Sequence, residues 1–146
     1  MKKCLVGVRH AAAKSAVAVG LLLGSMLCAA PVLAQQVAAA MLAEYSAKAG
    51  RPVSAEQGQK FFTTNFGRDL GLSCSSCHGA VPTGTGKDQV SDKAIAPLAP
   101  AVNPKRFTDR SRVEFMFRMN CLDIVGRECT AAEKADLLSW LLSLSP

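Results

Sequence analysis

The first 34 residues of this 146-residue chain contain no acidic side chain. Their basic residues are Lys2, Lys3, Arg9 and Lys14. An apolar stretch spans residues 16–30, and a small-residue sequence, Val-Leu-Ala, follows at 32–34. A basic start, an apolar middle and a small-residue end are the three parts of a cleaved export signal. We therefore expect residues 1–34 to be a signal peptide, whose removal leaves one domain of 112 residues, 35–146.

This segment also lacks the long uninterrupted apolar run of a membrane anchor. Gly20, Gly24 and Ser25 break the stretch, which is shorter than the roughly 20 residues of a spanning helix. Cys28 follows Leu27, whereas a lipidated cysteine follows a small residue, so lipoprotein processing is disfavoured as well. The sequence predicts a periplasmic protein without stable membrane insertion once the signal is cleaved.

The chain after the signal has little net charge. The whole sequence has 17 Lys and Arg against 11 Asp and Glu, but four of the basic residues belong to the signal. The remaining 13 basic and 11 acidic residues give a net charge of +2. This small excess gives no support for nucleic-acid binding or for a polybasic membrane surface.

No stretch shows the alternation of apolar and polar residues that is typical of a strand, and no internal repeat is found. Helix-forming residues and capping patterns instead predict four helices, at residues 37–48, 54–62, 109–122 and 130–144. Residues 79–105 hold most of the prolines after the signal, so we expect a long loop there that wraps around something bulky. The predicted fold class is all-α.

Histidine is scarce, because only His78 remains once the signal with His10 is removed. The five residues from Cys74 to His78 read Cys-Ser-Ser-Cys-His, the C-x-x-C-H pattern of covalent haem attachment. Two thiols one helical turn apart can reach the two vinyl groups of haem, and the adjacent imidazole can then bind the iron. The motif predicts one covalent haem c, with Cys74 and Cys77 as attachment sites and His78 as an iron ligand.

Three other uses of these cysteines fit less well. A thioredoxin-like redox pair needs a βαβ context, which the predicted helices do not provide. A zinc site completed by a distant cysteine would leave the fourth cysteine unpaired in an oxidising compartment. A simple disulfide between Cys74 and Cys77 would leave the adjacent His78 unexplained.

From about residue 54 to residue 144 the chain resembles the small soluble class I cytochromes c. The resemblance consists of a helix with Gly58 and Phe61 before the haem motif, a proline-rich loop, and a last helix whose Trp140 can pack on the first. It implies a small helical domain around one haem, with a role in electron transfer. We expect Tyr45 and Trp140 to lie in the core, in preference to bonding the haem propionates.

Methionine is absent from residues 80–104, the loop in which class I cytochromes place their axial methionine. The single histidine excludes a second histidine ligand. The candidates for the sixth position are therefore on the helix predicted at 109–122, namely Met116, Met119 and Asn120. A lysine, or no ligand, also remains open.

Asn120 directly before Cys121, with Cys129 eight positions later, resembles the sphaeroides haem protein (SHP) family and its relative cytochrome c''. In these proteins the residue before the first cysteine of a disulfide is the distal iron ligand, asparagine in the former and histidine in the latter. The resemblance implies a disulfide between Cys121 and Cys129 and iron ligation by His78 and Asn120. It also implies that the amide leaves the iron on reduction, which opens a site for O₂ or nitric oxide.

These observations predict a periplasmic monohaem cytochrome that exchanges electrons with a partner, for example a dihaem or membrane cytochrome, and binds small diatomic ligands when reduced. One alternative is a conventional electron carrier that uses Met116 or Met119. Another is an oxidoreductase acting on nitric oxide or O₂. The chain gives little support for an enzyme, because its one remaining histidine is assigned to the iron and no other acid–base residue is evident.

Two groups of residues are expected around the haem. Phe115, Met116 and Phe117 are predicted to line an apolar distal pocket. A basic cluster could pair with the haem propionates or dock an acidic redox partner, or could simply be a solvated face. Its members are Lys105, Arg106, Arg110, Arg112 and Arg118.

Overall fold

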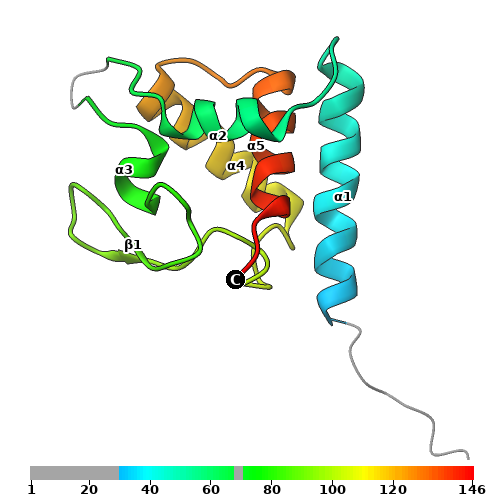
Figure 1. Cartoon of the computed structure of the whole chain (residues 1–146), viewed down its shortest axis with the longest axis horizontal. Coiled ribbons are helices and arrows are strands. Elements are labelled where there is room, and N and C mark those ends of the chain that lie inside the picture. Colours follow the sequence, from blue (N-terminus) through cyan, green and yellow to red (C-terminus); the bar gives the residue numbers. More distant parts are fainter. Residues whose placement is uncertain (1–29, 68–70) are drawn as a thin grey trace, which may run out of the picture.

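The computed structural model describes residues 30–67 and 71–146 (Figure 1). The first 29 of the 34 residues of the predicted signal therefore lie outside the described residues. The helices are α1 (Ala30–Lys48), α2 (Ala55–Thr63), α3 (Cys74–His78), α4 (Arg110–Asn120), a π-helix η1 (Cys121–Val125) and α5 (Ala131–Ser143). No helix within the described ranges combines the length and apolar character needed to cross a membrane.

The all-α prediction is confirmed, with one small correction in the long loop. Two-residue strands β1 (Gly86–Lys87) and β2 (Ala94–Ile95) pair antiparallel there. The turn between them is held by Asp88, whose carboxylate accepts hydrogen bonds from the backbone N–H groups of Val90 and Ser91. So short a pairing depends on turn contacts, and it leaves no alternating pattern in the sequence.

The helix starts follow the predicted caps. The side chain of Ser54 accepts from the Gln57 N–H at the start of α2, and that of Asp109 accepts from the Arg112 N–H at the start of α4. Thr130 opens α5 with a reciprocal capping box. Each of these bonds satisfies a backbone N–H that the helix itself leaves unpaired.

Helix α4 ends differently from the prediction, which extended it to residue 122. The α-helical hydrogen bonding stops at Asn120, and the chain continues as the π-helix η1. The Gly126 N–H donates to the carbonyl of Cys121, 3.0 Å away, and Gly126 has a φ of 81°. Apolar spacing does not reveal this change, because it depends on the backbone geometry that glycine permits.

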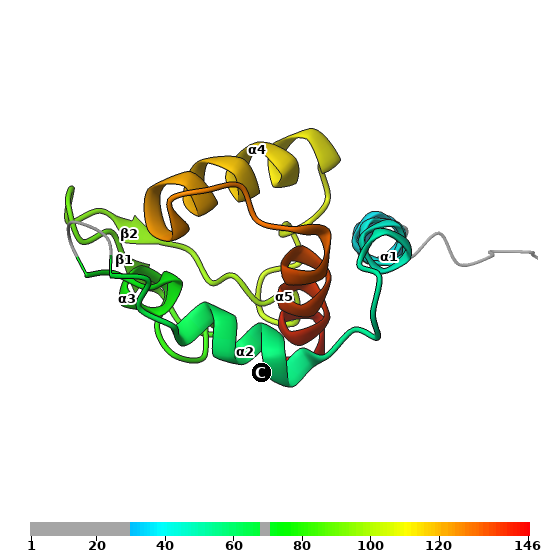
Figure 2. The ribbon, with the colours of Figure 1, turned by 90° about the horizontal axis from the view of Figure 1, so that it is seen from above.

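Helix α5 forms the centre of the fold, and α1, α2 and α4 surround it (Figure 2). The contact between α2 and α5 is made by the rings of Phe62 and Trp140, whose centroids are 5.0 Å apart. The prediction that Trp140 packs on α2 is therefore correct, and Phe62 makes the contact. The ring of Phe61 lies against Phe66, at 5.2 Å.

Candidate functional site

A cavity of about 760 Å³ lies between α3, α4, α5 and the long loop. Cys74, Cys77 and His78 line it from α3, and Asn120 lines it from the end of α4. The fold thus brings α3 and Asn120, which is 42 positions after His78 in the sequence, to the same cavity. The volume falls within the range of about 300–1,000 Å³ that is typical of small-molecule and cofactor sites.

The walls of this cavity are largely apolar. Their apolar side chains include Phe62, Leu72, Leu98, Val113, Phe117, Leu137 and Leu141. The β1–β2 turn also contributes lining residues, Asp88, Gln89 and Val90, which were not anticipated from the sequence. At Gly86 of β1 an added Cβ would lie 2.3 Å from the Cys77 carbonyl oxygen, so the strand packs directly on α3.

Helix α3 is short and is fixed at both ends. Ser73 caps it, with its backbone N–H donating to the Ser76 hydroxyl at 3.0 Å. Gly79 ends it with a φ of 80°. Cys74 and Cys77 both carry free thiols, half-buried and three residues apart on this helix. The two thiols therefore lie about one turn apart along the cavity wall.

The environment of α3 sets the protonation of its side chains. Burial raises the pKa of the Cys74 thiol to about 11, which keeps it protonated at neutral pH. Burial, and to a smaller extent the charge of Arg106, lowers the pKa of His78. The imidazole is therefore neutral at pH 7, which is the form that binds a metal.

Asn120 is the last α-helical residue of α4 and borders the cavity. Its side chain is exposed rather than buried, and no hydrogen bond joins it to another side chain within the described part of the chain. Met116, one turn earlier, also lines the cavity. Met119 is 39% exposed and is not among the lining residues. Of the two methionine candidates, Met116 alone reaches the site.

The predicted distal wall is correct for Met116 and Phe117 but wrong for Phe115. Phe117 is buried and lines the cavity. Phe115 is 60% exposed and does not line the cavity. Successive helical residues turn by about 100°, so the neighbouring pair 116 and 117 can face the cavity only if 115 turns away.

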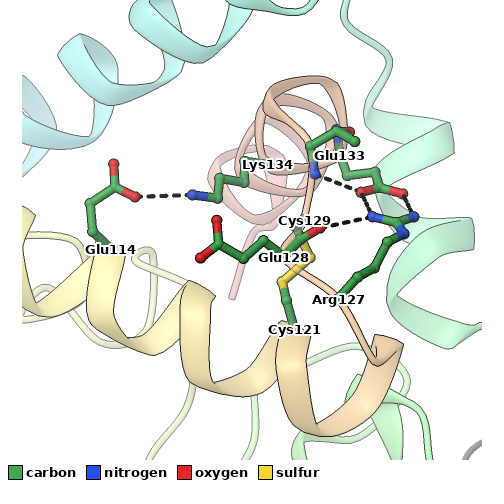
Figure 3. Close-up of a disulfide and its surroundings, with 8 residues drawn as sticks. Glu114, Cys121, Arg127, Glu128, Cys129, Glu133 and Lys134 are labelled. Atoms are coloured by element: carbon green, nitrogen blue, oxygen red, sulfur yellow. Dashed lines mark hydrogen bonds and ion pairs between the residues drawn. A yellow bond between two sulfur atoms is a disulfide. The ribbon is translucent and has the colours of Figure 1, made fainter.

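A disulfide joins Cys121, directly after Asn120, to Cys129, directly before the cap of α5 (Figure 3). The two Cα atoms are 5.7 Å apart. Within the loop that the bridge closes, Arg127 binds the two carboxylate oxygens of Glu133 at 2.8 and 2.6 Å. The bridge and the ion pair together tie the end of α4 to the start of α5.

The basic cluster divides into two groups. Lys105, Arg106 and Arg112 line the cavity. Arg106 also donates to the Pro97 and Ala96 carbonyls, at 2.8 and 2.6 Å, and so fixes the loop on this side. Arg110 and Arg118 do not line the cavity, and each pairs with a glutamate.

Tyr45 and Trp140 are core residues, as expected. Both are at least 95% buried, and neither lines the cavity. The Tyr45 hydroxyl donates to Glu114 at 2.7 Å. Neither ring is therefore available to a group bound in the cavity.

The residues present fit a covalently attached haem. Two thiols and a neutral imidazole stand on one wall, an amide stands on another, and cationic side chains lie among walls that are largely apolar. This combination of a small helical fold and a Cys-x-x-Cys-His cavity defines a c-type cytochrome. The protein carries one haem c.

Comparisons with known proteins specify the family. The chain is 47% identical over 120 residues to the cytochrome c-type protein SHP of Cereibacter sphaeroides, covering 80% of this chain and 92% of the relative. It is 44% identical over 92 residues to cytochrome c'' of Methylophilus methylotrophus, covering 62% and 64%. Residues 48–141 match a family model described as a domain of unknown function (DUF1924). The chain belongs to the family that contains SHP and cytochrome c''.

Solved structures agree with this assignment. Oxidised SHP, described as an oxygen-binding cytochrome c, matches with a TM-score of 0.67 at 45% identity, covering 73% of this chain and 96% of that one. Oxidised cytochrome c'' from Methylophilus methylotrophus matches with a TM-score of 0.68 at 34% identity, covering 80% and 98%. The resemblance expected from the sequence is thereby confirmed, together with the helical fold.

Proposed function

We propose that this monohaem cytochrome transfers electrons and binds O₂ or nitric oxide at its iron when reduced, with His78 and Asn120 as the axial ligands of the oxidised form. Cys74 and Cys77 would hold the haem through thioether bonds. The observation that carries the proposal is the single cavity lined by both thiols, the imidazole and the Asn120 amide. The description of the SHP structure as an oxygen-binding cytochrome c supports the ligand-binding part.

The two proposed ligands differ in strength. A neutral imidazole is a firm ligand for haem iron, whereas an amide is weak, neutral and hard. Haem iron, once bound, supplies one-electron redox chemistry and a binding position for diatomic molecules. Asn120 at the end of α4 would occupy that position in the ferric protein and give it up in the ferrous protein. The surrounding walls, with Val113 and Phe117, keep the position apolar.

Met116 is the alternative distal ligand, because it also lines the cavity. A thioether is soft and stabilises ferrous iron, so it would make the protein a conventional electron carrier. We favour Asn120, because it lies beside the Cys121–Cys129 bridge, which fixes the backbone next to it.

The second alternative, an oxidoreductase that acts on nitric oxide or O₂, would need an acid–base residue near the iron. Among the described residues that line the cavity, Asp88, Asp109 and Asp123 are the carboxylates.

We further propose that residues 1–34 direct the protein to the periplasm and are cleaved before Gln35. Removal at this point would shorten α1, which begins at Ala30. The oxidised pair Cys121–Cys129 supports an oxidising compartment. The electron-exchange partner would be another cytochrome. Mass spectrometry of periplasmic protein would show Gln35 as the first residue, and an intact residue 1 would contradict the cleavage.

Acid–acetone extraction tests the attachment. The haem should stay with the protein in the wild type and should be extracted from a Cys74→Ala/Cys77→Ala variant. Extraction of the haem from the wild type would contradict covalent attachment.

The absorption spectrum of the ferric protein tests the distal ligand. Ligation by Asn120 predicts a high-spin or nearly high-spin ferric spectrum and ready binding of carbon monoxide by the ferrous form. Asn120→Met should convert the spectrum towards low spin, while Met116→Leu should leave it unchanged. A wild-type absorption band of iron–methionine ligation that disappears in Met116→Leu would assign the position to Met116.

A further inference from the structure

Helix α4 is held against α1 and α5 by four side chains, Tyr45, Glu114, Phe117 and Lys134, which we call the Glu114 cluster. Glu114 receives two hydrogen bonds at its carboxylate. The Tyr45 hydroxyl of α1 donates to one oxygen at 2.7 Å, and the Lys134 ammonium of α5 donates to the other at 3.1 Å (Figure 3 shows the second bond). One carboxylate on α4 thus binds both neighbouring helices.

Phe117 connects this carboxylate to the cavity. The Tyr45 ring meets the Phe117 ring edge-on, with centroids 6.0 Å apart and planes at 89°. The Lys134 nitrogen lies 5.6 Å from the centre of the Phe117 ring and 5.4 Å from that of Tyr45. Both partners of Glu114 therefore also touch Phe117, which is buried and lines the cavity.

The cluster is close to the proposed distal ligand along α4. Phe117 precedes Asn120 by three residues, about 4.5 Å along the helix axis, and both line the cavity. Glu114 lies one turn further back. A small tilt of α4 or a rotation of the Phe117 ring would therefore change the position of the Asn120 amide and the size of the space beside it.

A second carboxylate at the same helix pair provides a comparison. Glu44 of α1 pairs with Arg110 of α4 and with Lys48, and its side chain is 36% exposed, as is that of Glu114. Its partners are exposed, Arg110 by 47% and Lys48 by 64%. The partners of Glu114 are largely buried: the Lys134 side chain is 18% exposed, and Tyr45 is 4% exposed. Ion pairs with mobile, exposed partners contribute little to rigidity.

The charge state of the cluster suits a fixed anchor. Burial by itself would raise the pKa of Glu114, but the hydrogen bonds from Tyr45 and Lys134 bring it below its usual value. Burial and the adjacent carboxylate raise the pKa of Tyr45 above its usual range. At neutral pH the carboxylate is therefore charged and the hydroxyl keeps its proton, so both hydrogen bonds persist.

We propose that Glu114 is a positioning residue for the haem site: through Tyr45 and Lys134 it fixes Phe117 and the end of α4, and so sets how firmly Asn120 closes the distal side. This inference rests on the proposed role of Asn120. It assigns to α1 and α5, which carry no iron ligand in our proposal, control over ligand access to the iron.

The test compares three variants of the full-length haem-loaded protein. Tyr45→Phe removes one hydrogen-bond donor but keeps the ring against Phe117. Glu114→Gln removes the charge that binds Lys134 but keeps an acceptor for Tyr45. Glu44→Gln is the matched control, because it removes a carboxylate between the same two helices whose partners are exposed.

The measurements are the ferric absorption spectrum, the rate of cyanide binding to ferric protein, and amide hydrogen exchange in α4. Tyr45→Phe and Glu114→Gln should bind cyanide about threefold to tenfold faster than the wild type, the size of effect of residues that influence a site without contacting it. Their ferric spectra should shift further towards high spin, and the amides of residues 117–120 should exchange faster. Glu44→Gln should match the wild type in all three.

Loss of stability in Tyr45→Phe and Glu114→Gln with unchanged cyanide rates, spectra and exchange would reduce the cluster to a structural anchor and overturn the proposal. Equal changes in Glu44→Gln would overturn it too, because a general loosening of α1 would then be the cause.

The variant Asn120→Ala distinguishes a failure of this inference from a failure of the proposed function. If that variant keeps the wild-type ferric spectrum, Asn120 is not the ligand and the ligation proposal fails. In that case, faster amide hydrogen exchange at Phe117 in Tyr45→Phe would still show that Tyr45 anchors α4.

Discussion

Gly58 of α2 lies directly on the backbone of Asp136 in α5. A Cβ added to Gly58 would be 2.1 Å from the Asp136 carbonyl oxygen and 2.8 Å from the Leu137 nitrogen. These are backbone atoms, which cannot turn aside as a side chain can. The two helices can therefore approach each other this closely only with glycine at position 58, and this approach lets Phe62 reach Trp140.

Gly58→Ala should force α2 away from α5 and destabilise the haem-loaded protein by roughly 3 kcal/mol or more, at the upper end of overpacking effects. Chemical denaturation followed by circular dichroism measures the loss. Gly84→Ala is the control, because no atom lies within 4 Å of a Cβ at that exposed position. Equal stability of the two variants would show that the α2–α5 contact adapts.

The buried carboxylate of Asp136 should also be required for stability. Its side chain is 3% exposed, binds Arg51 with both oxygens and accepts the Ser54 N–H at 2.8 Å. Asp136→Ala leaves that N–H without its partner and should cost about 2–3 kcal/mol, because hydrogen bonds to a charged group are strong. Glu128→Ala, which breaks an exposed pair with Arg118, should change the unfolding midpoint little. A similarly small loss in Asp136→Ala would contradict this role.

The disulfide should affect the haem site as well as the stability. A Cys121→Ser/Cys129→Ser variant should lose about 2–3 kcal/mol of unfolding free energy, as expected for closing a short loop. Because Cys121 adjoins Asn120, the released backbone should also speed cyanide binding to the ferric protein and shift its reduction potential. Both are measured well below the unfolding midpoint. Unchanged cyanide kinetics in the folded variant would limit the bridge to stabilising the fold.

Acid should weaken the fold through its paired glutamates. A hydrogen bond from Arg127 lowers the pKa of Glu133, and, against the effect of burial, bonds from Tyr45 and Lys134 lower that of Glu114. A carboxyl whose folded pKa is depressed stabilises the protein above its unfolded pKa, about 4.3, and loses that contribution as the pH falls through the folded value. The melting temperature should therefore be nearly level down to about pH 5 and fall below it.

Glu133→Gln isolates one of these groups, because glutamine keeps the capping bond to Thr130 while it loses the charge that binds Arg127. Melting temperatures of this variant and the wild type should differ at pH 7, and the difference should shrink as the pH falls below about 4.3, the usual glutamate pKa. A difference that stays constant with pH would show that the ionised form of Glu133 adds no stability.

Local patterns in the sequence predicted much of the fold. The caps at Ser54, Asp109 and Thr130 depend on neighbours three residues away, so the sequence alone located three helix starts. The haem motif is equally local, because its chemistry lies in five consecutive residues. These features need no knowledge of what packs against them.

The open points and the errors concern choices that depend on distant partners. The sequence predicts that Trp140 packs on the helix at 54–62 but does not say whether Phe61 or Phe62 meets it, because the two are adjacent and equally apolar. Two neighbouring stripes of α4 carry apolar residues, and only the position of α5 and Tyr45 turns Phe117 inwards and leaves Phe115 exposed. Spacing identifies such stripes but does not say which one faces the core.

Cys121 itself lines the cavity, so three of the four cysteines after the signal border one space, and of these three Cys121 is the one in a disulfide. The same lining thus contains the sulfur that ties the end of α4 to the start of α5 and the two cysteines of the haem motif. Loss of the bridge would therefore alter the wall of the haem cavity itself as well as the connection between the two helices.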